Sequence, residues 1–255
     1  MATVFVTGSS DGIGAQTARA LVAGGHRVVL HARNEQRAAV ARDAVAGAAG
    51  VVVGDAESLA QVRSVAEQAT AMGPYHVVIH NAGVGGSDRR VVTADGFERI
   101  FQVNVLLPYL LTCLMPRPQR LVYLSSGLEA NGVVDLADLN YERKPWQGFQ
   151  AYCDSKLCDV LLAFAVARLW PGVVSNAVDP GWIKTKLGGA GATDELPEGA
   201  QTQVWLATSD EGTALTGRYL KRRKDLRANP AAYDTALQDR LLAACAAMTG
   251  AVLPS

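Results

Sequence analysis

Tyr152 and Lys156 are the residues of this sequence whose types and spacing most directly suggest chemistry. Side chains four positions apart lie on one face of an α-helix, so this spacing can hold the lysine ammonium beside the tyrosine hydroxyl. A positive charge there favours the phenolate, which turns a weak acid, with an ordinary pKa of roughly 10, into a usable proton donor and acceptor. The spacing is common by chance, so the interpretation depends on the other motifs in the chain.

A glycine-rich stretch near the start of the chain predicts a seat for a dinucleotide. It reads Thr-Gly-Ser-Ser-Asp-Gly-Ile-Gly over residues 7–14, directly after an expected strand and directly before an expected helix. Gly8, Gly12 and Gly14 let the backbone turn tightly and approach a pyrophosphate, while the helix N-terminus offers free N–H groups and the positive end of its dipole. The spacing is Gly-x-x-x-Gly-x-Gly, not the Gly-x-Gly-x-x-Gly of the usual Rossmann fingerprint.

Length and composition narrow the class of protein. A chain of 255 residues with 49% hydrophobic residues is compatible with one domain over residues 1–255. The 24 basic and 24 acidic residues balance, and the basic run 221–224 is interpreted as a solvated turn, so no nucleic acid partner is expected. No segment approaches the roughly 20 apolar residues that cross a bilayer. The first strand begins almost at Met1, so we expect a cytoplasmic protein without a signal peptide or membrane span.

The cysteines and histidines show no metal-ligand spacing, so no metal site is expected. Without a Cys-x-x-Cys pair, the four thiols are interpreted as reduced, and the four imidazoles as structural or strand-end residues. They are Cys113, Cys153, Cys158 and Cys245, and His26, His31, His76 and His80.

Short apolar runs alternate with helical patterns along the chain. The runs lack polar alternation, which is typical of parallel strands buried on both faces. The alternation predicts a single doubly wound (Rossmann-type) α/β domain with a mostly parallel seven-stranded sheet and helices on both faces. The expected strands cover residues 3–7, 27–30, 51–53, 76–80, 120–124, 173–178 and 218–220, and the expected helices 13–23, 35–46, 58–72, 97–115, 149–169, 200–207 and 230–248.

Two irregular stretches, residues 127–148 and 184–198, follow the carboxyl ends of expected strands. Ligands bind at that edge of an open α/β sheet, and long loops there are commonly functional. We therefore expect both to be substrate loops. The glycine-rich run 188–191 is compatible with a mobile lid over the substrate or with a plain connector.

These motifs, in this order, resemble those of the short-chain dehydrogenase/reductase family over nearly the whole chain. The glycine stretch matches the family's Thr-Gly-x-x-x-Gly-x-Gly, residues 80–83 match its Asn-Asn-Ala-Gly with His80 in place of the first asparagine, and residues 179–185 match its Pro-Gly segment. The resemblance implies hydride transfer between a nicotinamide cofactor and a carbonyl or alcohol carbon. It also implies four catalytic residues, which are Asn104, Ser126, Tyr152 and Lys156.

The resemblance implies a role for each of the four. Tyr152 would exchange a proton with the substrate oxygen, and Ser126 would hydrogen-bond the same oxygen. Lys156 would favour the tyrosinate and bind the nicotinamide ribose. Asn104 would distort its helix locally and hold a water that links Lys156 to solvent. Ser125 is the alternative to Ser126 as the catalytic serine.

The cofactor seat implied by the resemblance draws on several segments of the chain. Asp55 would contact the adenine, and the Ile183 backbone and the Thr185 hydroxyl would hold the nicotinamide carboxamide. The residues expected to bind the cofactor are Gly8, Ser10, Asp11, Gly12, Ile13, Gly14, Arg33, Asp55, Ala56, Asn81, Ala82, Gly83, Tyr152, Lys156, Pro180, Ile183 and Thr185.

The choice between the two nicotinamide cofactors is argued from the end of the second strand. Enzymes that prefer NAD place a carboxylate there for the ribose 2′-hydroxyl, but this chain has Arg33 and no carboxylate. Arg33 can pair with a 2′-phosphate through a charge-assisted contact. We therefore expect NADPH/NADP+ to be preferred, with NADH possible because Asp11 in the glycine loop argues the other way. A solvated residue at the helix start is the plain alternative for Arg33.

The segment 138–153 resembles that of the retinol-dehydrogenase-like branch of the family. With Ser126, the side chains of Trp146, Trp182 and Leu187 are expected to bind a small apolar carbonyl or alcohol substrate. Phe149 is a further candidate for the lining of this apolar pocket. The alternative for the aromatic side chains Trp146, Phe149 and Trp182 is that they cover the edge of the core.

Family members commonly assemble through their two long helices, so we expect a homodimer or homotetramer built on residues 97–115 and 149–169. Two other functions stay open from the sequence: an epimerase or dehydratase of the extended relatives, and a non-catalytic dinucleotide-sensing protein. The short C-terminal part argues against the first, and the complete set of catalytic residue types argues against the second.

Overall fold

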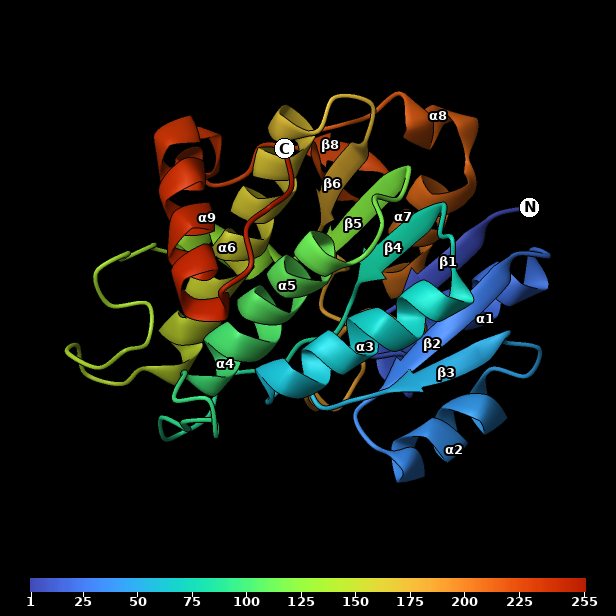
Figure 1. Ribbon diagram of the computed structural model, residues 1–255, viewed down its shortest axis with the longest axis horizontal. Coiled ribbons are helices and arrows are strands. Elements are labelled where there is room, and N and C mark those ends of the chain that lie inside the picture. Colours follow the sequence, from blue (N-terminus) through green and yellow to red (C-terminus); the bar gives the residue numbers. More distant parts are fainter.

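The sheet of this protein has the strand order β3-β2-β1-β4-β5-β6-β7-β8, as seen in the computed structural model of residues 1–255 (Figure 1). Neighbouring strands are parallel up to β7, and β8 runs antiparallel to β7. The order reverses between β1 and β4, which is the switch point where open α/β sheets bind ligands. The strands are β1 Thr3–Val6, β2 Arg27–Ala32, β3 Gly50–Val53, β4 Val77–His80, β5 Arg120–Leu124, β6 Val174–Val178, β7 Tyr219–Lys221 and β8 Lys224–Leu226.

Helices cover both faces of this sheet, which confirms the predicted fold class. The larger core cluster includes side chains of α3, α5 and α6, and the smaller one includes side chains of α1, α2 and α7. Helix α9 packs against the outside of α6 (Figure 1). The helices are α1 Gly12–Ala23, α2 Glu35–Ala44, α3 Leu59–Met72, α4 Arg99–Phe101, α5 Leu107–Leu114, α6 Gly148–Leu169, α7 Leu196–Thr208, α8 Asp210–Thr213 and α9 Thr235–Thr249, with short segments η1 Gln102–Leu106, η2 Gly127–Asn131 and η3 Pro230–Tyr233.

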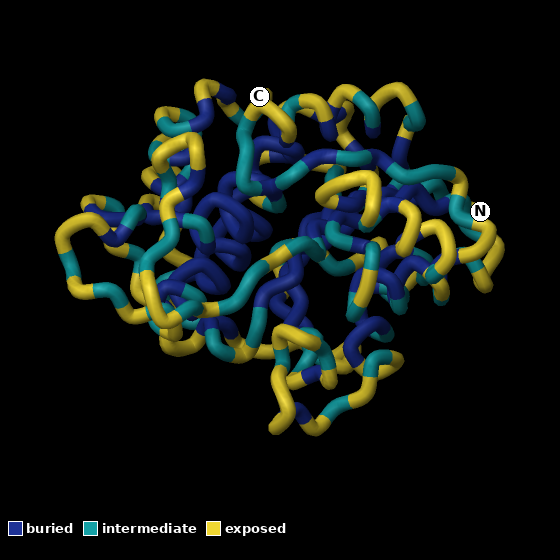
Figure 2. The backbone as a smooth tube through the Cα atoms, turned by 90° about the horizontal axis from the view of Figure 1, so that it is seen from below, coloured by how far each residue is buried: buried dark blue, intermediate teal, exposed yellow.

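The continuous apolar runs form the central strands because both sheet faces are covered. Phe5 of β1 pairs with Val29 of β2 on one side and with Val78 of β4 on the other, and all three are fully or almost fully buried. Buried backbone therefore lies at the centre of the molecule, and exposed backbone is concentrated in the loops around it (Figure 2). None of the helices combines the length and apolar character that a bilayer crossing requires.

The sheet has eight strands where seven were predicted. The basic run 221–224 is indeed a turn, in which Arg222 and Arg223 adopt left-handed backbone angles with φ of 49° and 61°. Two such residues form the tight turn that suits a two-residue hairpin. The returning strand β8 is three residues long and fully exposed, so it has no apolar pattern by which the sequence would reveal it.

The long helix predicted over residues 97–115 consists of three parts. The short helix α4 is followed by η1, a π-helical segment in which backbone hydrogen bonds join residues five positions apart. Helix α5 follows η1. The π-helical segment contains Asn104, which is 1% exposed. The interruption therefore falls at a predicted site residue.

Candidate active site

Helix α6 brings Tyr152 and Lys156 to the carboxyl end of β5. The Lys156 Nζ lies 5.7 Å from the centre of the Tyr152 ring and donates hydrogen bonds of 2.8 Å to the Leu124 carbonyl and to the Asp159 carboxylate. Burial acts to lower the pKa of Lys156, but Asp159 and Tyr152 outweigh it, so the pKa is raised. The site thus holds a fixed, charged ammonium beside the tyrosine.

Asn104 connects the loop after β4 to this turn of α6. Its Oδ1 accepts from the Val84 N–H at 2.8 Å, and its Nδ2 donates to the Val84 carbonyl at 3.1 Å and to the Ser155 hydroxyl at 2.9 Å. The Ser155 hydroxyl in turn donates to the Tyr152 carbonyl. The π-helical segment places the Asn104 amide where it reaches both elements.

The two serines at the end of β5 have different surroundings. The Ser125 hydroxyl is buried and donates to the Lys156 carbonyl at 2.7 Å, so its only proton is used. The Ser126 oxygen accepts from the Leu128 N–H at 3.3 Å, and no protein acceptor takes its hydroxyl proton. Its carbonyl also accepts from the Tyr219 hydroxyl at 3.0 Å. Ser126, unlike Ser125, therefore keeps a donor free for a ligand.

The glycine loop is shaped for close backbone approach. Gly8 and Gly12 have φ of +60° and +56°, and a Cβ on Gly8 would lie 2.8 Å from the Ala82 Cα. A Cβ on Gly14 would collide with the Asn81 amide and the Gly8 carbonyl. Asn81 Nδ2 donates to the Thr7 carbonyl at 2.9 Å and to the Gly8 carbonyl at 3.1 Å. This glycine cradle in front of the α1 N-terminus fits a pyrophosphate.

Thr7 and His31 support the loop and were not predicted as site residues. The Thr7 hydroxyl oxygen accepts from the N–H groups of Asn81 and Ala82 at 2.9 and 3.0 Å. His31 Nδ1 accepts from the Gly8 N–H at 3.0 Å, and its Nε2 lies 2.8 Å from the Gly54 carbonyl, which requires the neutral imidazole. Burial lowers the pKa of His31, which keeps the ring in this form.

Two arginines follow β2, of which only Arg33 was predicted as a cofactor-binding residue. Arg33 is exposed beyond β2, and its guanidinium forms no hydrogen bond or ion pair in the structure. Arg37, in the first turn of α2, donates to the Ser10 hydroxyl at 3.0 Å and to the Asp11 carboxylate at 2.6 Å. Arg37 is therefore the arginine that touches the glycine loop.

The remaining cofactor candidates surround the same loop. Asp55 Oδ1 accepts from the Glu57 N–H at 3.0 Å, which shapes the turn after β3. The Thr185 methyl would lie 3.5 Å from a Cβ on Gly12, so the loop after β6 rests on the glycine loop. Ala56 and Ile183 are buried, whereas Ile13 and Pro180 are half-buried and Gly83 is exposed.

The expected substrate residues separate into two groups. Trp146 packs edge-on against Tyr141, and its Nε1 donates to the Ser87 carbonyl at 2.9 Å, so it covers the core edge. Trp182 and Leu187 are 55% and 53% exposed, and so is Phe149 at 62%. We call Phe149, Trp182 and Leu187 the apolar rim.

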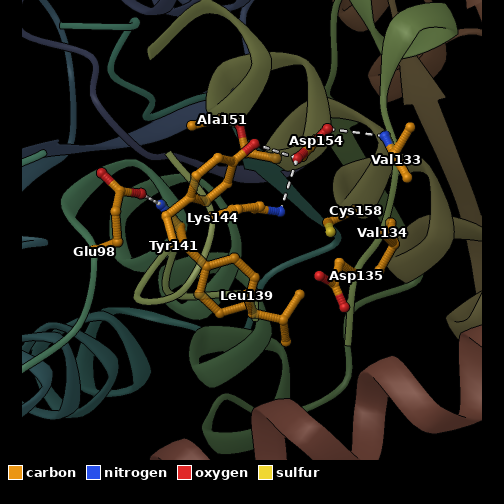
Figure 3. Close-up of a pocket in the computed structure, with 12 residues that line it drawn as sticks. Glu98, Val133, Val134, Asp135, Leu139, Tyr141, Lys144, Ala151, Asp154 and Cys158 are labelled. Carbon is orange, nitrogen blue, oxygen red and sulfur yellow. Dashed lines mark hydrogen bonds and ion pairs between the residues drawn. The ribbon is translucent and has the colours of Figure 1, made fainter. Parts of the chain in front are cut away.

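A pocket beside α6 is not part of this site (Figure 3). Asp154 is one of its lining residues and accepts from the Val133 N–H at 2.8 Å and from the Tyr141 hydroxyl at 2.5 Å, with Lys144 Nζ at 3.8 Å. These bonds attach residues 133–144 to α6. The polar groups of Asp154, Tyr141 and Lys144 in this pocket therefore already have partners within the protein.

The chain resembles known proteins both in sequence and in structure. The short chain dehydrogenase family profile matches residues 2–196. Short-chain dehydrogenase chyC of Penicillium rubens is 42% identical over the full length of both chains, and human retinol dehydrogenase 13 is 32% identical over 99% of this chain and 86% of its own.

Among solved structures, a protein of Mycobacterium paratuberculosis superposes with a TM-score of 0.88 at 27% identity, covering 100% of this chain and 96% of its own. A blue fluorescent protein from a metagenomic library, in complex with NADPH, has a TM-score of 0.70 at 27% identity, covering 86% and 95%. The profile match and the identity with full-length relatives lead to one conclusion: the chain belongs to the short-chain dehydrogenase/reductase family.

Proposed function

We propose that this chain is an NADPH-preferring oxidoreductase of small apolar carbonyl compounds and alcohols, with Tyr152 exchanging the proton. As a family member, it is a nicotinamide-dependent enzyme that acts on carbonyl and alcohol groups. The buried Lys156 ammonium, 5.7 Å from the Tyr152 ring centre, is the observation that carries the proposal. A cation in that place lowers the free-energy cost of the phenolate, which suits the tyrosine to exchange a proton with the substrate oxygen.

Each of the other catalytic candidates has a function that its contacts support. When bound, the nicotinamide cofactor supplies or accepts the hydride. In the reducing direction, Tyr152 gives its proton to the substrate oxygen, and Ser126 donates its free hydroxyl to the same oxygen as negative charge builds up. Asn104 keeps the loop after β4 aligned with α6, because its amide binds both Val84 and Ser155.

The apolar rim supports an apolar substrate. Leu187 lies against Gly85, and the neighbouring Gly86 meets the backbone at the start of α6, next to Phe149. Exposed apolar side chains gathered beside a catalytic residue usually mark a binding surface. Retinol dehydrogenase 13, whose name refers to an apolar alcohol, is a sequence relative. We therefore propose ketones, aldehydes and alcohols with an apolar body as substrates.

The two arginines support a preference for NADPH. Arg33, exposed at the end of β2, and Arg37, whose guanidinium is bonded to Ser10 and Asp11, are the residues that would hold a 2′-phosphate. Two guanidinium groups offer charge-assisted bonds to a phosphate. Asp11 opposes this preference, but its carboxylate is paired with Arg37 and lies 3.6 Å from the Lys186 ammonium.

The proton role is tested with Tyr152→Phe, which removes the hydroxyl and keeps the ring. We expect kcat for NADPH-dependent reduction of an apolar ketone to fall by about 10²-fold or more, with little change in NADPH affinity measured by fluorescence titration. Full activity in this variant would contradict the proposed chemistry. Tight NADPH binding without turnover in the wild type would instead favour the dinucleotide-sensing alternative.

The cofactor preference is tested with Arg37→Ala and Arg33→Ala. Each loss of a charge-assisted contact is expected to raise the Kd for NADPH by about ten- to a hundredfold and leave the Kd for NADH nearly unchanged. Arg42→Ala, in the last turn of α2, is a matched control that removes the same charge away from the seat. Equal effects on both cofactors would show that the arginines do not bind the 2′-phosphate.

A further inference from the structure

Lys156 has a buried partner on its own helix that the Tyr-x-x-x-Lys motif does not contain. Asp159 lies one helical turn further on, and its Oδ2 accepts from Lys156 Nζ at 2.8 Å. The two side chains are only 4% and 6% exposed. An ammonium has three donors, and the Leu124 carbonyl takes a second one, so one donor is left for Tyr152 and a bound ligand.

We propose that Asp159 is a positioning residue for Lys156: its carboxylate fixes the ammonium, and its protonation state sets how much of the lysine charge acts on Tyr152. The inference rests on the proton chemistry proposed for Tyr152. A carboxylate one hydrogen bond from the ammonium offsets much of its field at the tyrosine. A neutral Asp159 leaves that field unopposed and favours the phenolate more strongly.

The Asp159 carboxyl of this pair changes its protonation state close to neutral pH. Burial raises the pKa of Asp159 to about 6, although Lys156 acts to lower it. Below that pH the carboxyl is protonated in the folded protein and the lysine charge is unopposed. Above it, the Asp159 carboxylate offsets the lysine charge that acts on the Tyr152 hydroxyl.

The titratable groups around Asp159 do not change charge in the same range. Burial raises the pKa of Tyr123, on β5, and of Cys158, on α6, and in both cases Asp159 adds to the shift. Burial lowers the pKa of His80, which stacks on Tyr123, to about 3. Burial also raises the pKa of Cys113 to about 11 and that of Cys245, on α9, further still. Asp159 is therefore the group of this cluster that titrates between pH 5 and 7.

The test is the pH profile of kcat for alcohol oxidation, which needs the basic form of Tyr152. Asp159→Asn keeps an oxygen acceptor but removes the charge, and we expect the rising limb to move to lower pH by about one unit. Asp159→Ala also loses the acceptor, and we expect kcat to fall by about tenfold or more, with the KM for the alcohol nearly unchanged. Partial rescue of kcat in the asparagine variant would separate anchoring from charge.

Asp239→Asn is the control, because it removes an equal charge from α9, where Asp239 forms a surface pair with Arg168 of α6. An Asp159→Asn profile identical to that of the wild type would overturn the proposal. A second measurement needs no variant: the assigned carboxyl carbon-13 signal of Asp159 in the wild type should titrate near pH 6. A carboxyl that titrates below pH 5 would also overturn it. The carbon-13 signal is measured without turnover, so it does not depend on enzyme activity. A wild type without oxidoreductase activity would contradict the proposed function but would not change the result of the Asp159 titration.

Discussion

At the scale of single residues, His80 is the clearest departure from the family pattern. Its Nε2 lies 3.1 Å from the Thr112 hydroxyl, and its Nδ1 is buried without a hydrogen-bond partner. The ring stacks on Tyr123 with centres 4.7 Å apart, in a region that gives a positive charge no compensation. Burial therefore lowers the pKa of His80 to about 3, and the folded protein keeps the ring neutral.

We predict that this histidine makes the fold less stable in acid. The unfolded chain takes up a proton near pH 6.5, but the folded protein does not until about pH 3, so the free energy of unfolding falls as pH drops through this window. The loss is about 1.4 kcal/mol per pH unit. Buried His31 acts in the same sense, and Asp159, with its raised pKa, acts in the opposite one.

The measurement is urea unfolding at pH 8 and pH 5 for the wild type and His80→Asn. The asparagine variant should lose about 1 to 2 kcal/mol less than the wild type between the two pH values. Comparing the variant with the wild type cancels the contributions of the other titratable groups. Equal losses would mean that the His80 ring is protonated within the fold or is not buried.

At the scale of elements, the core strands and most of the helices could be predicted because their patterns are local. The central strands are apolar runs, and α1, α3 and α6 begin or end within one residue of the predicted boundaries. The apolar pattern predicted one continuous helix there, and only the family resemblance implied a local distortion at Asn104, where η1 lies. The Asn104 amide is bonded to Val84 and Ser155, which are on other segments of the chain. A sequence pattern indicates which face of a helix is apolar, but not which residues of other segments will hydrogen-bond to it.

The site residues also divide into those with a local sequence pattern and those that depend on contacts with other segments. The Tyr-Lys pair and the glycine loop are recognisable from their spacing together with the order of the other motifs. Thr7, His31 and Asp159 act through contacts between segments or with a single neighbour. Arg37 had a weak signal in the sequence. A basic residue in the first turn of a helix is unfavourable for the helix dipole, so its presence there suggests another purpose.

At the scale of the whole molecule, the chain covers its own long helices. Residues 250–255 run across α5 and α6, where the Tyr109 hydroxyl donates to the Ala251 carbonyl and the Trp170 Nε1 to the Pro254 carbonyl, both at 2.7 Å. Helix α9 covers a further part of α6. The surface through which we expected a homo-oligomer is thus occupied by this chain's C-terminal part.

We therefore predict a monomer of 26.9 kDa by light scattering at micromolar concentrations. Deleting residues 250–255 removes the hydrogen bonds of the Tyr109 hydroxyl and the Trp170 Nε1 and uncovers both rings, at a cost of about 2–3 kcal/mol. The midpoint of thermal unfolding should fall by roughly 5–10 °C, and the truncated chain should associate as concentration rises. A stable full-length dimer would contradict this prediction and restore the helix-pair interface.

Because the apolar rim is exposed, substitutions there can change the substrate preference with little effect on the free energy of unfolding. Asn104 and Lys156 are buried and Tyr152 is half-buried. The rim side chains Phe149, Trp182 and Leu187 are each more than half exposed. Substitutions at such positions usually change the free energy of unfolding by less than about 0.5 kcal/mol. The fold can therefore explore new substrates through rim substitutions while its catalytic centre stays intact, which makes this molecule a favourable starting point for directed evolution.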